Sequence, residues 1–256
     1  MLSEHVRVTR NAGVLSIILD RPERRNAITV AMYAALADAI ETAANDETIR
    51  IVTICGEGQD FAAGNDIADF QTALPRDTNE IPVWRLLRAL ATCETPLVAA
   101  VHGNCVGIGT TMLLHCDLVL ADEGARFSLP FVDLALVPEA ASTLLLPRLA
   151  GRRQAARHLL LGEPFGVDEA ITMGIVSHRV VSGQLGAMLA DVVARLLAKP
   201  PAALMATQRL LRAGSSGEVL ERMKLESELF AERLSSAEAK EAFTAFFEKR
   251  KPNFGG

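Results

Sequence analysis

Residues 97–121 read LVAAVHGNCVGIGTTMLLHCDLVLA, the longest apolar stretch of the chain. Its length would suit a membrane-spanning helix. Polar side chains such as His102 and Asp117 interrupt it, however, and so do three glycines. The stretch is therefore better explained as a series of short buried elements: a strand over 97–101, a glycine-containing turn, a helix over 108–115 and a strand over 118–121.

The same alternation extends toward the N-terminus. Apolar runs predict strands over 14–19 and 51–55, and helical spacing of apolar residues predicts helices over 30–44 and 83–92. Thr29 is placed to cap the first of these helices. Because strands alternate with helices, we expect an α/β fold with parallel strand pairing.

Beyond about residue 140 the pattern becomes mainly helical. A pair of prolines at 200–201 and the segment GSSG at 214–217 separate successive helices. We expect an α/β core over residues 1–195, followed by a helical C-terminal region over 196–256. The helices predicted in this half span 152–161, 184–198, 202–212, 218–234 and 237–248.

The composition narrows the class of protein. The 256 residues are 50% hydrophobic and 22% charged, which fits one large globular domain or a core with an appendage. A net charge of -5 without a long Lys/Arg run gives no basis for nucleic-acid binding. The first ten residues are too polar for a signal peptide, and the last four carry no peroxisomal address. The four cysteines lack metal-ligand spacing and are typical of free thiols in a reducing compartment, so we expect a soluble, cytoplasmic protein with no membrane partner.

Glu139 is a candidate proton carrier. It lies in the stretch 134–143, LALVPEAAST, where apolar and small neighbours would desolvate its carboxyl and raise its pKa. The alternative is a glutamate at a helix N-terminus after Pro138, where it would complement the helix dipole. Asp133 is a second acid nearby, which we expect to be structural or solvated.

Two glycine-containing turns offer backbone N–H groups that could bind an oxyanion. Segment 61–67 reads FAAGNDI, and segment 103–111 reads GNCVGIGTT after a strand and before a helix. Each could instead be an ordinary turn, and we expect His102 and His115 to be packing histidines. The chain has no dinucleotide fingerprint, P-loop, GxSxG or HExxH sequence. Two such turns combined with one carboxylate suit enolate chemistry.

Six segments carry a family likeness in their order and spacing. They are LDRP at 19–22, RNA at 25–27, FAAGNDI at 61–67, VHG through GIG at 101–109, CDLVLA at 116–121 and FFEKR at 246–250. Together they resemble the crotonase (enoyl-CoA hydratase/isomerase) superfamily over nearly the full length of the chain. The resemblance implies a crotonase-like spiral of ββα units with a helical C-terminal trimerisation region, assembled as a homotrimer or a dimer of trimers. It also implies an acyl-CoA thioester substrate and neither a metal nor a separate cofactor, because coenzyme A is part of the substrate.

The resemblance also assigns roles to individual residues. The oxyanion hole maps onto the backbone N–H groups of Asn65 and Ile108. A lysine common in the family is replaced by Glu23 here, so the phosphate contact of that lysine is not expected. Substrate contacts map onto Ala27, Ala63, Gly64, Asp66, Ile67, Gly107, Gly109, Phe246 and Lys249, the last two from this chain or from a neighbouring subunit.

The positions of the catalytic acids distinguish the activities of this superfamily. The two glutamates of enoyl-CoA hydratases correspond to Thr111 and Phe131, whereas the single glutamate of Δ3,Δ2-enoyl-CoA isomerases falls on Glu139. The resemblance therefore predicts an isomerase that converts 3-enoyl-CoA to trans-2-enoyl-CoA with Glu139 as a catalytic residue. The alternatives are an enoyl-CoA hydratase and a catalytically silent acyl-CoA-binding trimer. Residues 68–82 are expected to shape the acyl pocket.

Overall fold

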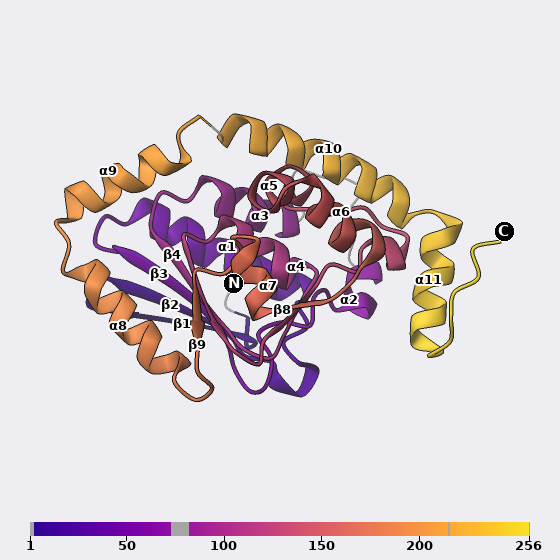
Figure 1. Ribbon diagram of the computed structural model, residues 1–256, viewed down its shortest axis with the longest axis horizontal. Helices are drawn as coiled ribbons and strands as arrows, with labels where there is room; N and C mark the ends of the chain where they lie inside the picture. The colour runs from indigo at the N-terminus through magenta and orange to yellow at the C-terminus, as the bar shows by residue number, and fades with distance from the viewer. Residues whose placement is uncertain (1–2, 73–81, 215, 256) are drawn as a thin grey trace.

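A six-stranded sheet forms the centre of the molecule (Figure 1). The computed structural model describes residues 3–72, 82–214 and 216–255. The strands of this sheet are β1 (Val6–Asn11), β2 (Val14–Leu19), β3 (Ile51–Gly56), β4 (Leu97–Val101), β6 (Leu118–Asp122) and β9 (His178–Val180). Their order is β1-β2-β3-β4-β6-β9; β1 is antiparallel to β2, and the other neighbours are parallel. The predicted α/β fold with parallel strand pairing is confirmed.

After β4, the chain continues into a second, smaller sheet. It consists of β5 (Asn104–Val106), β7 (Arg126–Ser128) and β8 (Phe165–Gly166) in the order β5-β7-β8. β5 follows directly on β4, and the chain turns between the two sheets at Gly103, whose φ is +59°. A Cβ there would lie 2.0 Å from the carbonyl oxygen of Gln59, so the corner requires glycine.

Helices cover both faces of the central sheet. All five residues of β4 are buried, as expected for a parallel strand enclosed on both sides. On one face, α8 (Leu185–Leu197) packs over a cluster that includes Ile51, Val98 and Leu120. The other face carries the larger core, built with α1 (Val30–Asn45) and α3 (Pro82–Thr92).

Most predicted helices lie where the sequence indicated. The side chain of Thr29 accepts a hydrogen bond from the backbone N–H of Met32, so the predicted cap of α1 is confirmed. The predicted helix over 108–115 is wrong as a single α-helix, because α4 (Ile108–Thr111) passes into a 3-10 turn over Met112–His115. The remaining helices are α2 (Ile67–Thr72), α5 (Ser142–Ala150), α6 (Arg152–Leu161), α7 (Val167–Thr172), α9 (Pro201–Arg212), α10 (Ser216–Leu234) and α11 (Ala237–Phe247), with further 3-10 turns at Pro22–Arg24 and Val132–Leu134.

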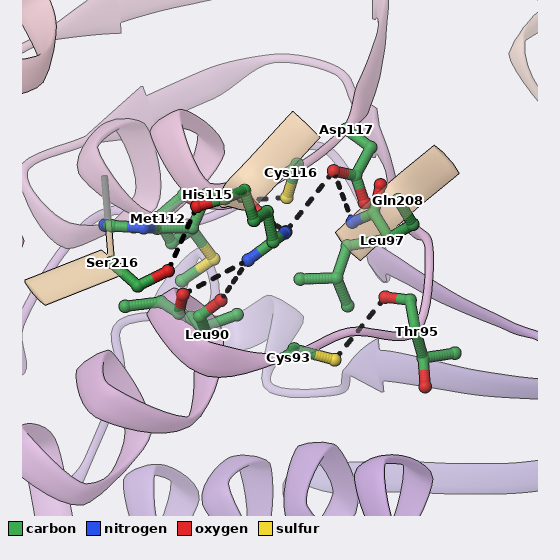
Figure 2. Close-up of polar contacts among 12 residues, drawn as sticks. Leu90, Cys93, Thr95, Leu97, Met112, His115, Cys116, Asp117, Gln208 and Ser216 are labelled. Carbon is green, nitrogen blue, oxygen red and sulfur yellow. Dashed lines mark hydrogen bonds and ion pairs between the residues drawn. The ribbon is translucent and has the colours of Figure 1, made fainter. Parts of the chain in front are cut away.

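The C-terminal helices α9, α10 and α11 wrap around the outside of the core (Figure 1). Arg212, at the end of α9, donates hydrogen bonds to the carbonyl oxygens of Leu90 (2.9 Å) and His115 (2.7 Å). Its guanidinium also lies 3.3 Å from the carboxylate of Asp117, which accepts a 2.7 Å hydrogen bond from Gln208 (Figure 2). These contacts tie the helical region to the core. Residue 195 lies within α8, and the predicted division there stays a prediction.

All four cysteines are free; Cys93 and Cys105 are buried, and Cys55 and Cys116 are half-buried. Among the helices that the structure describes, none is long and apolar enough to span a membrane.

Candidate active site

A pocket of about 550 Å³ opens between the glycine-containing turns of the core and the helices α10 and α11. Of the residues that the sequence assigned to the site, those lining it are Ala27, Ala63, Gly64, Asn65, Asp66, Ile67, Gly107, Ile108 and Phe246. Gly109 and Lys249 do not line it. Phe246 reaches the pocket from α11 of the same chain, so no neighbouring subunit is needed for that contact.

The two glycine-containing turns run side by side in a parallel register. Ala62 pairs with Cys105 in an isolated bridge, in which the N–H of Val106 donates to the carbonyl oxygen of Ala62 at 2.9 Å. Three residues further along each segment, the chains reach Asn65 and Ile108. The register therefore brings the two predicted oxyanion-hole residues to the same end of the paired turns, at the pocket.

The backbone N–H groups of Asn65 and Ile108 are available to a ligand. The bridge between Ile28 and Asn65 uses the carbonyl of Gly64 and the N–H of Asp66, which leaves the N–H of Asn65 directed away from Ile28. Ile108 is the first residue of α4, where an amide has no partner within the helix. In the described parts of the chain, neither amide has a hydrogen-bond acceptor.

The glycines beside these amides allow the two turns to approach each other. Gly64 has a φ of +91°, and a Cβ there would lie 3.1 Å from the carbonyl oxygen of Val106. Gly107, with φ +55° and ψ -118°, leads into α4. Gly109 was assigned to substrate binding, but a Cβ there would lie 3.0 Å from that of Ala62. It therefore allows close packing of the turns rather than lining the pocket.

Glu139 is a buried carboxylic acid. Its side chain is 1% exposed, and its Oε1 is buried without a hydrogen-bond partner. Burial, and then the nearby charge of Glu226, raises the pKa of Glu139 to about 8. The residues that follow it, Ala140 and Ala141, have φ values of +61° and +54°, a backbone conformation that alanine rarely adopts. Such conformations cluster at functional sites because the surrounding structure must hold them in place.

The alternative role for Glu139, a cap at a helix N-terminus, is filled by another residue. α5 begins at Ser142, and its first amides are bound by Glu226 of α10. The Glu226 carboxylate accepts hydrogen bonds from the N–H groups of Ala141 (2.6 Å) and Thr143 (3.0 Å) and from the Thr143 hydroxyl. Glu139 is therefore free of the capping role.

Two further side chains surround the Glu139 segment. His115 lies with its Nε2 2.8 Å from the carbonyl oxygen of Ala140, and burial lowers its pKa to about 4, so it is a neutral hydrogen-bond donor. This agrees with its predicted packing role. Tyr33 of α1 donates its hydroxyl to Oδ1 of Asn65, and burial followed by the charge of Glu139 raises its pKa. Tyr33 thus contacts Asn65 of the predicted oxyanion hole and is close enough to Glu139 for the charge of that acid to act on it.

Sequence reasoning missed Tyr33 and Glu226. The signal for Glu226 is present in the sequence, because it occupies the buried stripe of α10 formed by Val219, Met223 and Phe230. A glutamate at an apolar position of an amphipathic helix needs hydrogen-bond partners inside the fold. Those partners, at 141 and 143, lie about 80 residues away in the sequence, and no local pattern identifies them.

The two positions that the resemblance predicts to correspond to the hydratase acids carry other groups here. Thr111 is buried in α4, and Phe131 lines the pocket. Asp133 also lines the pocket and is exposed, in agreement with its predicted solvated role. Glu139 is not part of the pocket lining, although Leu136 of the same segment is. The carboxyl is therefore buried outside the lining of the pocket.

Charged residues stand at the mouth of the pocket. Arg24 lines it and is exposed, one residue after Glu23. Arg250 also lines it, but Glu241 and Glu248 form ion pairs with it. Lys249, assigned to the substrate by its sequence position, is exposed and adopts a φ of +54°. Arg24 and Arg250 are therefore the cations that the pocket itself presents.

The remaining expectations concern the acyl pocket and metals. Ala68 lines the pocket, whereas residues 73–81 of the expected acyl-pocket segment lie outside the described residues. Within the described residues, no group of three His, Cys, Asp or Glu side chains could hold a metal ion. The absence of a metal or separate cofactor stays a prediction.

Known proteins share both the sequence and the shape of this chain. It matches the enoyl-CoA hydratase/isomerase family over residues 9–256. It is 32% identical to 2,3-dehydroadipyl-CoA hydratase of Escherichia coli (strain K12), over 97% of this chain and 98% of that protein. It is 33% identical to 1,2-epoxyphenylacetyl-CoA isomerase of the same strain, over 95% of each. The crystal structure of an enoyl-CoA hydratase/isomerase from Pseudoalteromonas atlantica T6c has a TM-score of 0.94 and 41% identity, over 98% of this chain and 100% of that one.

These likenesses extend over the core, the glycine-containing turns and the C-terminal helices. They confirm the predicted crotonase fold and the predicted class of enzyme. The names of the relatives include both hydratases and an isomerase, so they support the common chemistry of the family. The chain belongs to the enoyl-CoA hydratase/isomerase family of the crotonase superfamily and is an enzyme that acts on acyl-CoA thioesters.

Proposed function

We propose that this enzyme moves the double bond of a 3-enoyl-CoA to give the trans-2-enoyl-CoA, with Glu139 as its base and acid. The proposal rests on the burial and the raised pKa of the Glu139 carboxyl. It is 1% exposed, and its pKa is raised to about 8. The acid positions of hydratases are occupied by Thr111 and Phe131, neither of which moves a proton at neutral pH. One proton carrier is sufficient for isomerisation, whereas hydration also has to position and activate a water molecule.

The reaction proceeds in two proton transfers. The ionised Glu139 removes a proton from C2 of the thioester, and the electron pair of that bond is delocalised into a dienolate. The N–H groups of Asn65 and Ile108 hold the thioester oxygen as its negative charge develops. Glu139, now protonated, returns the proton to C4, and the double bond is left between C2 and C3. Each amide of such a hole contributes about 10²- to 10³-fold to the rate, and the acid–base group about 10²- to 10⁴-fold.

The raised proton affinity of Glu139 suits this chemistry. A carbon acid next to a thioester gives up its proton reluctantly, and a carboxylate with an ordinary pKa is a weak base toward it. A base with a pKa near the working pH combines a usable ionised fraction with a larger driving force for proton transfer. A pKa of about 8 meets that condition.

Catalysis by Glu139 requires a path from the pocket to its carboxyl. Leu136, on the same segment, lines the pocket and is 7% exposed. We infer that a bound acyl group displaces the side chain of Leu136, so that C2 and C4 reach Glu139. The CoA portion then stays at the mouth of the pocket, near Arg24 and Phe246.

Purified protein with 3-hexenoyl-CoA tests the proposal. Formation of the conjugated 2-enoyl thioester is followed by its absorbance, and Glu139→Gln is expected to lower kcat by about 10²- to 10⁴-fold. Asp133→Asn is the matched control, because Asp133 is an exposed acid of the pocket wall. It is expected to retain kcat within about threefold, as a solvated group outside proton transfer should. A Glu139→Gln enzyme with wild-type activity would refute the assignment.

A hydratase is the second candidate, and the name of the 2,3-dehydroadipyl-CoA hydratase relative favours it. Hydration of crotonyl-CoA that depends on Glu139 and exceeds isomerisation would support it. Tight acyl-CoA binding without turnover of either substrate would instead support a silent binder. The family resemblance further leads us to propose a cytoplasmic homotrimer or a dimer of trimers, which sedimentation of the purified chain tests.

A further inference from the structure

A second buried carboxylate lies beside Glu139. We propose that Glu226 of α10 is a positioning residue for the reaction: as an ionised carboxylate it holds the segment 139–143 in place and makes Glu139 a stronger base. This inference rests on the proposed role of Glu139. It assigns to the C-terminal helical region a part in the chemistry, through a side chain that does not touch the substrate.

The contacts of Glu226 fix the backbone around Glu139. Its carboxylate accepts from the N–H groups of Ala141 at 2.6 Å and Thr143 at 3.0 Å, and its side chain is 3% exposed. These amides follow Glu139 by two and four residues and open α5. Because Ala140 and Ala141 adopt positive φ values, this backbone needs such contacts to keep its conformation.

Glu226 has more contacts that favour its ionised form than Glu139 has. Burial raises the pKa of Glu226, but hydrogen bonds from Thr143 and Ala141 and the charge of Arg222 oppose that rise. The N-terminus of a helix also favours an anion at this position. Oε1 of Glu139 has no hydrogen bond that would stabilise its charged form. The hydrogen bonds that Glu226 accepts therefore favour its ionised form, whereas Oε1 of Glu139 has none.

The other titratable groups around Glu139 come from three elements. Tyr33 of α1 and the buried His115 are both neutral near pH 7, because burial raises the pKa of the phenol and lowers that of the imidazole. Arg222 of α10 donates a 3.1 Å hydrogen bond to the Thr143 hydroxyl, and its charge lowers the pKa of Glu226. Glu226 therefore supplies the negative charge that opposes ionisation of Glu139.

α10 joins this carboxylate to the pocket. Glu226 shares the buried stripe of the helix with Phe230, which lines the pocket. A movement of α10 would therefore change both the pocket wall and the charge beside Glu139. The proposed role thus follows from the position of the helix as well as from the charge.

The experiment separates the charge of Glu226 from its capping contacts, in the full-length chain. Glu226→Gln keeps an acceptor oxygen for the α5 amides but removes the charge. Glu226→Asp keeps the charge on a shorter side chain, and Glu221→Gln on the exposed face of α10 is the matched control. The measurements are kcat and KM for 3-hexenoyl-CoA against pH, and the ¹³C NMR titration of the Glu139 carboxyl, assigned by its loss in Glu139→Gln.

Glu226→Gln is expected to lower the midpoint of the kcat–pH profile and the midpoint of the NMR titration of Glu139 by about one pH unit each. Removal of a neighbouring like charge favours ionisation. Its limiting kcat at high pH should fall about threefold, as for a weaker base, with KM unchanged. Glu226→Asp and Glu221→Gln should keep the wild-type midpoints. Unchanged midpoints in a folded Glu226→Gln would overturn the proposal. If Glu226→Gln does not fold, Glu226→Asp provides the test. A wild-type midpoint in Glu226→Asp supports the proposal, and a midpoint lowered by about one pH unit overturns it.

The NMR titration distinguishes failure of this proposal from failure of the proposed function. If Glu139→Gln remains active, Glu139 is not the base and the kinetic profile no longer reports on it. The carboxyl titration still measures whether the charge of Glu226 acts on Glu139. A lowered NMR midpoint together with an active Glu139→Gln would support the contact and refute the catalytic role.

Discussion

The substitution Glu139→Gln should stabilise the protein increasingly as the pH rises. The folded-state pKa of Glu139 is about 8, against an ordinary value of 4.5 for the unfolded chain. Between these two pH values the folded state retains a proton that the unfolded state has released. Unfolding therefore releases a proton in this window, and the free energy of unfolding of the wild type falls as the pH rises from about 4.5 to about 8. Glutamine carries no such proton, so the variant escapes this loss.

The magnitude follows from the difference between the two pKa values. Each unit of difference corresponds to about 1.4 kcal/mol once the pH has passed through it. The loss is then roughly 1 kcal/mol at pH 5.0 and roughly 4–5 kcal/mol at pH 8.5. The side chain is 1% exposed, so solvent screening does not reduce the figure much. The cost of burying the new amide is the same at both pH values and cancels. The stability of the variant relative to the wild type should therefore rise by about 3–4 kcal/mol between pH 5.0 and 8.5.

Urea unfolding at the two pH values measures this difference. The chain has one tryptophan, Trp84, whose ring lies 6.4 Å from that of Phe230 on α10, so its fluorescence reports on docking of the C-terminal helices. Glu221→Gln, an exposed substitution on the same helix, should show no pH-dependent difference from the wild type. The reasoning is refuted if Glu139→Gln and the wild type keep the same stability difference at both pH values, because the carboxyl would then have an ordinary pKa in the fold.

Three further substitutions test other parts of the structure. Arg24→Ala is expected to raise KM for CoA thioesters about two- to fivefold with kcat little changed, because an exposed cation contributes about 1 kcal/mol or less to anion binding; steady-state kinetics measures it. Ile108→Pro removes one of the two proposed oxyanion donors at a helix position that tolerates proline, so kcat should fall by ~10²- to 10³-fold while the circular dichroism spectrum stays unchanged. Arg212→Met removes the donor to the carbonyls of Leu90 and His115 and the cation beside the carboxylate of Asp117, which keeps its hydrogen bond from Gln208; it should lower the free energy of unfolding by about 2–4 kcal/mol in urea titrations.

The sequence predicts those elements whose signal is local. β4 occupies the predicted residues 97–101, and α6 occupies 152–161, because a continuous apolar run and a helical apolar stripe are each complete within one segment. β1 was missed, since most of its residues are exposed on an edge strand and it carries no apolar run. β9, with three residues, is too short for periodicity to reveal, and only its pairing with β6 makes it a strand.

Some residues of the site also have a local sequence signal, whereas the roles of others depend on distant partners. The turns around Gly64 and Gly107 were recognisable because a positive φ and a close approach of two backbones require glycine in the sequence. Gly109 was assigned a substrate contact by its neighbours in the sequence, whereas its real constraint is Ala62, from a distant segment. The roles of Tyr33 and Glu226 depend on partners brought together only by the fold, and periodicity carries no information about such pairs.

The contacts around Glu139 cross the predicted division near residue 195 between the core and the helical C-terminal region. The carbonyl oxygen of His115 accepts from Arg212 of α9, and its imidazole lies against the carbonyl of Ala140. The segment 139–143 is thus held by the core through His115 and by the C-terminal region through Glu226. A chain that ended at residue 195 would lose both Arg212 and Glu226 and leave buried amides at the start of α5 without an acceptor. The helical region therefore completes the environment of the proposed base, whatever else it does in an assembly.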